Sequence, residues 1–270
     1  MNFSVLISVY YKEKNEYLQE AIESLLFQTQ PPSQIVLVKD GPLTEDLEEL
    51  IHNFCKNNRE LFTIVEFPTN QGLGIALREG LKYCKYELVA RMDGDDICHK
   101  ERFSKQLKCF EKNPDLDIVG SAIAEFSESK EKIISERKMP LKHDEISEFA
   151  RKRNPYNHMT VMFRKQAVLQ AGNYEDFLWF EDYFLWVKML INGCHAENLE
   201  ESLVYARTGD LMFERRGGIA YAKQELLLQK KFLKMGFVSF ERFTINCLIR
   251  LTSRILPNPI RRMLYLKLLR

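Results

Sequence analysis

The sequence lacks the marks of several common protein classes. Its six cysteines include no C-x-x-C pair, which argues against a zinc ribbon or a disulfide framework and indicates reduced thiols. No apolar run approaches the roughly 18 residues that cross a bilayer. Residues 1–4 lack the basic region and cleavage site of a secretory signal. No G-x-G-x-x-G follows the first apolar run, which excludes a nicotinamide dehydrogenase. We therefore expect a cytoplasmic protein.

Basic charge is scarce over most of the chain and gathers near its end. The formal net charge of the 270 residues is +1. From Lys231 onward nine basic residues stand against Glu241 alone, about +8, so the remainder carries about −7. An acidic body argues against a nucleic-acid partner, which would require a basic stripe across the folded domain.

Apolar runs and helical periodicity alternate through the first hundred residues. Buried strands are predicted at 3–9, 35–38, 62–67 and 86–92, with an amphipathic helix after each of the first three. This alternation predicts a mostly parallel sheet with right-handed crossovers. Such sheets bind ligands at the carboxyl ends of their strands, which is where Asp40 and Asp93 are expected.

The pattern changes after about residue 100. The predicted strands are 116–126, 133–138, 158–164 and 203–207. The predicted helices are 100–112, one from about 144, 165–171, one led by residues 180–182, and a helical remainder from about 218.

The most informative motif is the run Asp93-Gly94-Asp95-Asp96 at the end of the fourth strand. Two carboxylates one residue apart at a strand end suit a hard divalent cation shared with a phosphate-bearing ligand. A plain turn, with Asp96 capping the next helix, explains the same residues taken alone.

An ordered set of motifs resembles the inverting glycosyltransferases of family 2. Its members are Val5-Leu6-Ile7-Ser8-Val9-Tyr10, Gln28-Thr29, Val36-Leu37-Val38-Lys39-Asp40-Gly41, Asn70-Gln71-Gly72-Leu73-Gly74, Met92-Asp93-Gly94-Asp95-Asp96, Glu101-Arg102-Phe103-x-x-Gln106 and Phe180-Glu181-Asp182-Tyr183-x-Leu185-Trp186. The resemblance implies an α/β GT-A (Rossmann-like) fold, with a mostly parallel central sheet flanked by helices. We expect a catalytic domain at 1–212, made of a nucleotide-binding half (1–98) and an acceptor half (99–212). A basic amphipathic helical extension is expected at 213–270.

The resemblance also implies a nucleotide site and a metal site. The nucleotide-binding residues would be Val9, Tyr10, Glu13, Asp40, Arg78 and Asp93. Asp95 and Asp93 would hold Mn²⁺ or Mg²⁺ as cofactor. Two positions depart from the family: Lys39 replaces an Asp, and Tyr11 replaces an Asn. Base recognition by Asp40 stays plausible, whereas ribose contacts are put in doubt. Arg78 fits a solvated helix charge equally well.

Asp182 matches the catalytic base of the family. Inversion needs a carboxylate opposite the leaving diphosphate to take the proton of the acceptor hydroxyl. The alternative is that Glu181 and Asp182 have no catalytic role and are acidic residues that the helix dipole favours at a helix N-terminus. The candidate contacts to acceptor or donor are His158, Trp179, Glu181 and Arg207. His158 could instead be a buried structural histidine, and Trp186 a core residue.

The implied activity is metal-dependent transfer of a sugar from a UDP-sugar to a saccharide or lipid-linked saccharide, in surface polysaccharide synthesis. The alternatives are a sugar-1-phosphate nucleotidyltransferase and a non-catalytic nucleotide-sugar-binding module. Tyr10-Tyr11-Lys12-Glu13 lacks the glycines that the nucleotidyltransferase would need. The presence of Asp93, Asp95 and Asp182 together disfavours a binding module, which has no need of a base opposite the metal. The basic apolar carboxyl end predicts peripheral attachment to the cytoplasmic face of a membrane, with an ordinary packed helix as the alternative.

Overall fold

The computed structural model describes residues 1–208 and 218–255. The first half contains β1 (Phe3–Val9), α1 (Asn15–Leu26), β2 (Gln34–Lys39), α2 (Glu45–Asn57), β3 (Phe62–Glu66), α3 (Leu73–Tyr83), β4 (Leu88–Met92) and β5 (Ile97–Cys98). The second half contains α4 (Arg102–Lys112), β6 (Leu116–Phe126), β7 (Ser135–Arg137), α5 (His143–Ala150), the 3₁₀ helix η1 (His158–Thr160), β8 (Met162–Arg164), α6 (Lys165–Gln170), α7 (Glu181–Ile191) and β9 (His195–Arg207). Two helices follow, α9 (Ile219–Lys234) and α10 (Phe240–Ile255).

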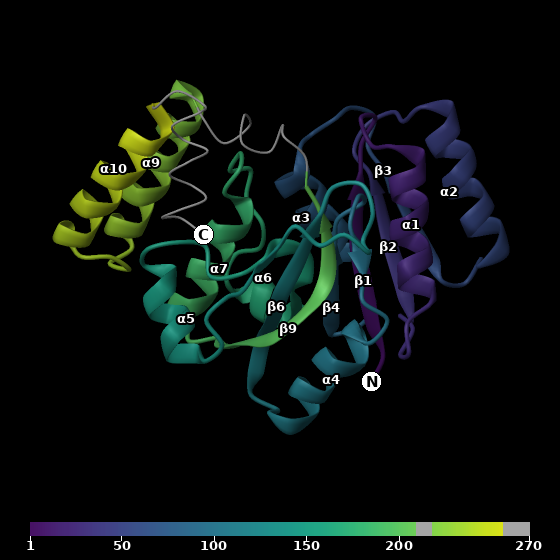
Figure 1. Cartoon of the computed structure of the whole chain (residues 1–270), viewed down its shortest axis with the longest axis horizontal. Helices are drawn as coiled ribbons and strands as arrows, with labels where there is room; N and C mark the ends of the chain where they lie inside the picture. The colour runs from purple at the N-terminus through teal and green to yellow at the C-terminus, as the bar shows by residue number, and fades with distance from the viewer. Residues whose placement is uncertain (209–217, 256–270) are drawn as a thin grey trace.

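The first four strands form the parallel sheet that the sequence predicts. Their order is β3-β2-β1-β4, and every neighbouring pair is parallel. Figure 1 shows α1 and α2 beside these strands. The carboxyl ends of β1, β2 and β4 therefore meet at one edge of the sheet, where Asp40 and Asp93 follow their strands.

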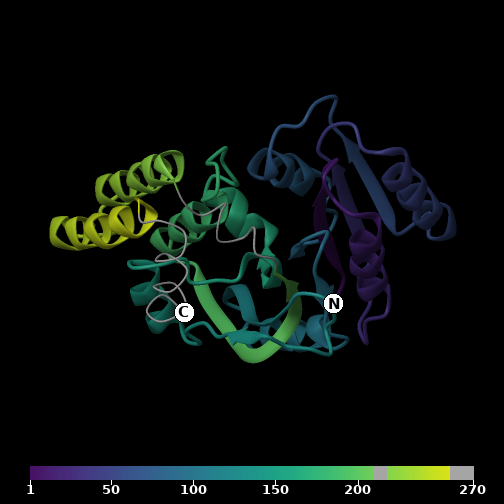
Figure 2. The same cartoon turned by 45° about the horizontal axis from the view of Figure 1, so that its top comes forward.

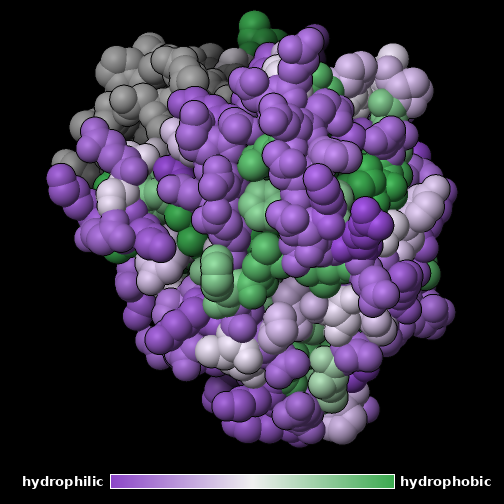
Figure 3. Space-filling model, turned by 90° about the vertical axis from the view of Figure 1, so that its right-hand side faces the viewer, coloured by the Kyte–Doolittle hydropathy of each residue, from purple (hydrophilic) through white to green (hydrophobic). Residues whose placement is uncertain are grey.

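Alternate residues of β1 feed two hydrophobic cores. Phe3, Val5 and Ile7 pack with residues of α1, α2 and α4 on one face. Leu6 packs on the other face with residues of α3, α6 and α7. Because side chains alternate across a strand, a continuous apolar run such as 3–9 fits only a strand that is covered on both faces. The outer side of the molecule, over α2, is largely hydrophilic (Figure 3).

The second half is a mixed sheet rather than a continuation of the parallel one. β8 pairs antiparallel with both β4 and β6, whereas β9 pairs parallel with β6 and antiparallel with β5. The long strand β9 curves strongly (Figure 2), and its register against β6 shifts at several points. The expected fold class, α/β with a central sheet flanked by helices, is confirmed, and the parallel pairing is concentrated in the first half.

Besides shifts of one to three residues at other element ends, the structure differs from the sequence prediction in three places. Residues 158–160 form a 3₁₀ turn instead of the start of a strand, because Thr160 bonds back to Asn157 through both its backbone and its hydroxyl. β9 begins eight residues earlier than expected, at His195. The two-residue strand β5 was not predicted, because so short an element has no periodicity.

The last two helices pack against the body of the protein. Phe232 of α9 and Val238 join a buried cluster with Phe184 and Val187 of α7. The predicted domain boundary at 212/213 falls within 209–217, outside the described residues. The basic residues Arg261, Arg262, Lys267 and Arg270 also lie outside them. Within the described ranges, no helix has the length and apolarity that crossing a membrane requires.

Candidate active site

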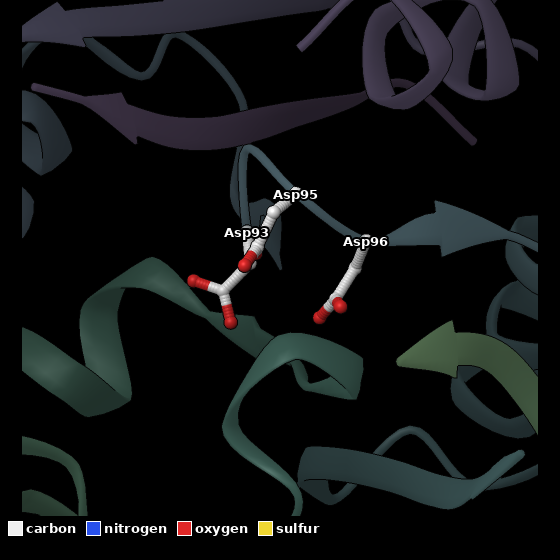
Figure 4. A group of neighbouring side chains, drawn as sticks. All are labelled: Asp93, Asp95 and Asp96. Atoms are coloured by element: carbon white, nitrogen blue, oxygen red, sulfur yellow. The ribbon is translucent and has the colours of Figure 1, made fainter. Parts of the chain in front are cut away.

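Three aspartates converge where β4 ends. Asp93, Asp95 and Asp96 lie on the short connection to β5, and one carboxylate oxygen from each falls within a group whose members are at most 4.8 Å apart. All three side chains point to the same side of this connection (Figure 4). The sequence run therefore does more than make a turn, because an ordinary turn would let its like charges separate into solvent.

A buried arginine underlies this cluster. Arg91 is only 1% exposed, and its guanidinium forms an ion pair with the half-buried Asp93. Its backbone N–H donates to the carbonyl of Val161, so the strand that delivers the aspartates is held on both sides. The one sequence signal for this role is a charged side chain inside the apolar run Leu88–Met92, and Arg91 was not among the predicted site residues.

Glu13 adds a fourth carboxylate from the loop after β1. It lies close against Gly94, where a Cβ would be 3.1 Å from Oε2 of Glu13. Burial, together with the charge of Asp95, raises the pKa of Glu13 to about 7. Burial and the charge of Asp93 raise the pKa of Asp95 to about 6. Burial and the charge of Asp95 hold the pKa of Asp96 well above its ordinary value.

The donor set of this cluster fits a hard divalent cation. It offers only carboxylate oxygens, which are the ligands that Mg²⁺ and Mn²⁺ prefer. Oδ2 of Asp96 is buried and has no hydrogen-bond partner within residues 1–208 and 218–255. The four carboxylates, when ionised, carry more negative charge than Arg91 and Arg207 offset, and the guanidinium of Arg207 also pairs with Glu20. A dication would reduce this excess of negative charge.

Arg207, the last residue of β9, also contacts the aspartate cluster. Its backbone N–H donates to Oδ1 of Asp96 at 2.8 Å, and its Nε donates to the carbonyl of Asp95 at 3.1 Å. The guanidinium also pairs with Glu20 of α1 and lies 3.8 Å from the ring centre of Tyr17. Arg207, a candidate contact of the donor or acceptor, is bound in this structure to the aspartate loop and to α1.

Asp40 is held by the loop that precedes α3. Its Oδ1 accepts from the backbone N–H of Gln71 at 2.6 Å, and its Oδ2 accepts from Asn70 Nδ2 and from the N–H of Gly72, both at 3.0 Å. Gly41 allows this approach, because a Cβ there would lie 2.6 Å from the backbone nitrogen of Asn70. The motif at 70–74 therefore organises Asp40, a link that the sequence order alone did not reveal.

The predicted base lies at the start of α7. Oδ2 of Asp182 accepts a 2.6 Å hydrogen bond from Asn154, and Oδ1 accepts from the N–H of Tyr183. Burial and the charge of Asp182 raise the pKa of the neighbouring Glu181 to about 7, and the charges of Arg91 and Asp93 also act on Glu181. Glu181, at the start of α7, therefore interacts electrostatically with its neighbour Asp182 and with Arg91 and Asp93 near the end of β4.

The remaining candidates are spread more widely. Val9 contributes its side chain to the core and its carbonyl to the N–H of Asp40, while the ring of Tyr10 contacts that of Tyr11. Arg78 lies on α3 with its side chain 40% exposed, and it pairs with Glu79.

His158 and Trp179 occupy different environments. The His158 side chain is partly buried, and its Nε2 hydrogen-bonds to the Tyr174 hydroxyl at 3.1 Å. Burial and the charge of Arg91 lower the pKa of His158 well below its usual value. Trp179 is 39% exposed with φ of 70°, and its ring contacts Tyr221 of α9. Trp186 is a core residue, as the alternative interpretation held.

Comparison with known proteins identifies the family. The sequence profile of Glycosyl transferase family 2 matches residues 4–176. The amylovoran biosynthesis glycosyltransferase AmsE of Erwinia amylovora is 42% identical over 266 residues, covering 98% of each chain. The Escherichia coli UDP-Gal:alpha-D-GlcNAc-diphosphoundecaprenol beta-1,3-galactosyltransferase is 35% identical over 270 residues, covering 99% of this chain and 96% of the relative.

Solved structures share the fold. S. aureus TarS 1–349 in complex with UDP-GlcNAc has a TM-score of 0.70 at 19% identity, covering 99% of this chain and 76% of TarS 1–349. Mannosyltransferase PcManGT from Pyrobaculum calidifontis, in complex with GDP-Man and Mn²⁺, has a TM-score of 0.68 at 14% identity, covering 97% of this chain and 72% of the mannosyltransferase. The chain belongs to glycosyl transferase family 2. It is a glycosyltransferase with a GT-A fold, as the ordered motifs predicted.

Proposed function

We propose that this protein transfers a sugar from a UDP-sugar to a saccharide or lipid-linked saccharide acceptor, with inversion, in the synthesis of a surface polysaccharide. The observation that carries this proposal is the carboxylate cluster at the end of β4, set in one electrostatic environment with Glu181 and Asp182 of α7. We infer that the end of β4 takes the leaving diphosphate and that the carboxylates of α7 face the acceptor.

Asp93 and Asp95 are the proposed metal ligands, with Asp96 supporting them from its buried position. A Mn²⁺ or Mg²⁺ bound there would supply electrostatic stabilisation of the departing diphosphate. The mannosyltransferase neighbour was solved with Mn²⁺, which supports this choice of ion. Val9, Tyr10, Glu13, Asp40 and Arg78 stay proposed contacts of the nucleotide.

Asp182 is the proposed general base. It takes the proton of the acceptor hydroxyl while that oxygen forms a bond to the anomeric carbon. The bond between the anomeric carbon and the diphosphate oxygen breaks at the same time, and its electron pair leaves with UDP. A single displacement inverts the anomeric centre. His158, Trp179, Glu181 and Arg207 stay candidates for contacts that orient the sugars.

The relatives support the choice of substrates. The E. coli relative is named for UDP-Gal and for a lipid diphosphate acceptor that carries GlcNAc, and AmsE is named for amylovoran synthesis. The TarS complex contains UDP-GlcNAc. We place the protein on the cytoplasmic side, because all six cysteines are free thiols, as expected in a reducing compartment. Membrane attachment through the basic carboxyl end stays a prediction.

A donor screen tests the function. UDP release is measured for a panel headed by UDP-galactose and UDP-GlcNAc, with Mn²⁺ or with EDTA, and with a polyprenyl-diphosphate-linked α-GlcNAc as the first acceptor. We expect one UDP-sugar to be consumed in a Mn²⁺-dependent manner. Consumption of GDP- or CMP-sugars alone, or equal rates in EDTA, would contradict the proposal.

A further inference from the structure

Side chains of α10 form hydrogen bonds to the turn that follows α5, residues 150–154. Nδ2 of Asn246 donates to the carbonyl of Arg151 at 2.8 Å, and the guanidinium of Arg250 donates to the carbonyl of the next residue, Lys152. Two successive backbone carbonyls of an irregular segment are therefore bound by side chains one helical turn apart on one face of α10. Apolar packing alone would not require this pairing.

α9 braces the same two side chains. Gln229 accepts a 2.9 Å hydrogen bond from Asn246, and the carboxylate of Glu225 pairs with Arg250. Glu225 is 1% exposed, so the pair lies in a region where breaking it would leave a desolvated charge. Asn246 and Arg250, each held by a side chain of α9, therefore form a polar clamp on the turn at 150–154.

The other end of the turn reaches the proposed base. Asn154 donates to Oδ2 of Asp182 at 2.6 Å. Tyr183, the neighbour of Asp182, returns a 2.6 Å hydrogen bond from its hydroxyl to the carbonyl of Ala150. The turn is thus held between α7 on one side and α10 on the other. Figure 1 shows α5 and α7 next to the α9–α10 pair.

We infer that the α9–α10 pair is a positioning element for catalysis: Asn246 and Arg250 fix the turn at 150–154, so that Asn154 holds the Asp182 carboxylate in the orientation that deprotonates the acceptor. This inference rests on the proposed function, which makes Asp182 the base. Asn154, Asn246 and Arg250 are positioning residues that act through Asp182. Backbone hydrogen bonds to the last turn of α5 already shape the start of this turn, and the contacts with α10 fix its place beside α7.

The test removes either the clamp or the contact to Asp182 that the clamp supports. Glu225→Leu/Arg250→Met replaces the ion pair with apolar side chains of similar size, which avoids an unpaired buried charge. Asn154→Ala removes the contact to Asp182 directly. We expect each to lower kcat for transfer by roughly 10-fold or more, because small misplacements of a catalytic group are costly. The KM for the UDP-sugar donor should stay near the wild-type value. Lys223→Met, at an exposed position on α9, is the matched control and should keep the wild-type rate.

Combining the variants separates positioning from general destabilisation. Adding Asn154→Ala to Glu225→Leu/Arg250→Met should cause little further loss, because both changes act through one contact. Fully multiplicative losses, or a wild-type kcat in the clamp variant, would overturn the inference. If the clamp variant shows no cooperative thermal unfolding, Asn246→Leu breaks the other contact of the clamp and is judged by the same criteria.

Asp182→Asn distinguishes this inference from the proposed function. If Asp182→Asn loses transfer while the clamp variants keep the wild-type kcat, the positioning role alone is wrong. If Asp182→Asn transfers at the wild-type rate, the assignment of the base is wrong and the positioning role fails with it.

Discussion

Arg91 and Asp93 form an ion pair in which the cation is buried and the anion faces the site. The guanidinium is 1% exposed, whereas the Asp93 side chain is 30% exposed. A fixed positive charge therefore lies beneath a cluster of carboxylates that would otherwise repel one another. It anchors the first aspartate of the motif while leaving Asp95 and Asp96 in a desolvated environment that favours protons or a cation.

Arg91→Met tests this anchoring role. Losing the cation leaves the carboxylates uncompensated, so the free energy of unfolding should fall by about 2 kcal/mol, a figure below that for fully enclosed pairs because Asp93 reaches solvent. Urea unfolding at pH 8 in EDTA measures the change, with Lys105→Met, which removes a lysine whose ammonium pairs with Glu101 and Glu201 at the surface, as the control. Equal stability of wild type and Arg91→Met would contradict the role.

Sequence patterns predicted the first half of the fold well and the second half less well. The parallel strands are covered on both faces, so each appears as a continuous apolar run with little ambiguity. In the second half, the irregular residues 158–160 carry the alternation typical of a strand but close into a turn through the Thr160 hydroxyl. The early start of β9 was missed because His195–Ser202 mixes polar and exposed residues.

The candidate site was predictable where its chemistry is local in sequence. The aspartates of 93–96 and the pair at 181–182 were found from their motifs. Asn154 was missed because a lone asparagine in a turn carries no signal, and its role depends on a contact 28 residues away. The partners of Arg207, namely Glu20 and Asp96, also come from distant segments that only the folded sheet brings together.

Asp95→Asn should abolish metal-dependent donor binding. A neutral amide is a poor ligand for a hard dication, so UDP affinity in Mn²⁺ should fall to the value measured in EDTA. Isothermal titration calorimetry of UDP binding, once in Mn²⁺ and once in EDTA, measures the two affinities. Glu23→Gln, on α1 outside the cluster, serves as the matched control. Unchanged Mn²⁺-dependent affinity in Asp95→Asn would remove this residue from the metal site.

The carboxylate cluster also predicts a pH dependence of stability. The folded state raises the pKa of Asp95 to about 6 and that of Glu13 to about 7, so it binds more protons than the unfolded chain between about pH 4 and 7. This contribution is present at low pH and is lost as pH rises through 6 to 7. A dication would replace the lost protons. The increase in unfolding temperature that Mn²⁺ gives over EDTA should therefore be larger at pH 8 than at pH 5.5.

A variant isolates the cluster from other titrating groups. The lowered pKa of His158 acts in the opposite direction, making the protein more stable as pH rises toward 6.5, with no further gain above that pH. Comparing Asp95→Asn with wild type cancels that contribution. The variant should show a smaller Mn²⁺ effect at both pH values. A Mn²⁺ effect that is independent of pH in the wild type would refute the link between the protons and the metal.

The membrane prediction depends on the basic end of the chain. Deleting residues 256–270 removes four basic residues and no acidic ones, so sedimentation with anionic vesicles at low salt should fall roughly 10-fold or more. Salt at 0.5 M should mimic the deletion in the intact protein by screening. Cutting at Lys234 instead would remove Val238 from the buried cluster that joins the last helices to α7. If the intact chain does not bind such vesicles, the prediction of membrane attachment is wrong.

The central claim, that Asp182 is the base of an inverting transfer, is tested most directly by Asp182→Asn. The amide keeps the size of the side chain but cannot take a proton from the acceptor, so transfer from the active UDP-sugar should fall by about 10² or more. UDP affinity in Mn²⁺ should remain near wild type, and Glu181→Gln should lose less activity. The wild-type product should carry a β linkage from an α-linked UDP-sugar. An Asp182→Asn enzyme with the wild-type transfer rate, or a product with retained configuration, would contradict the account.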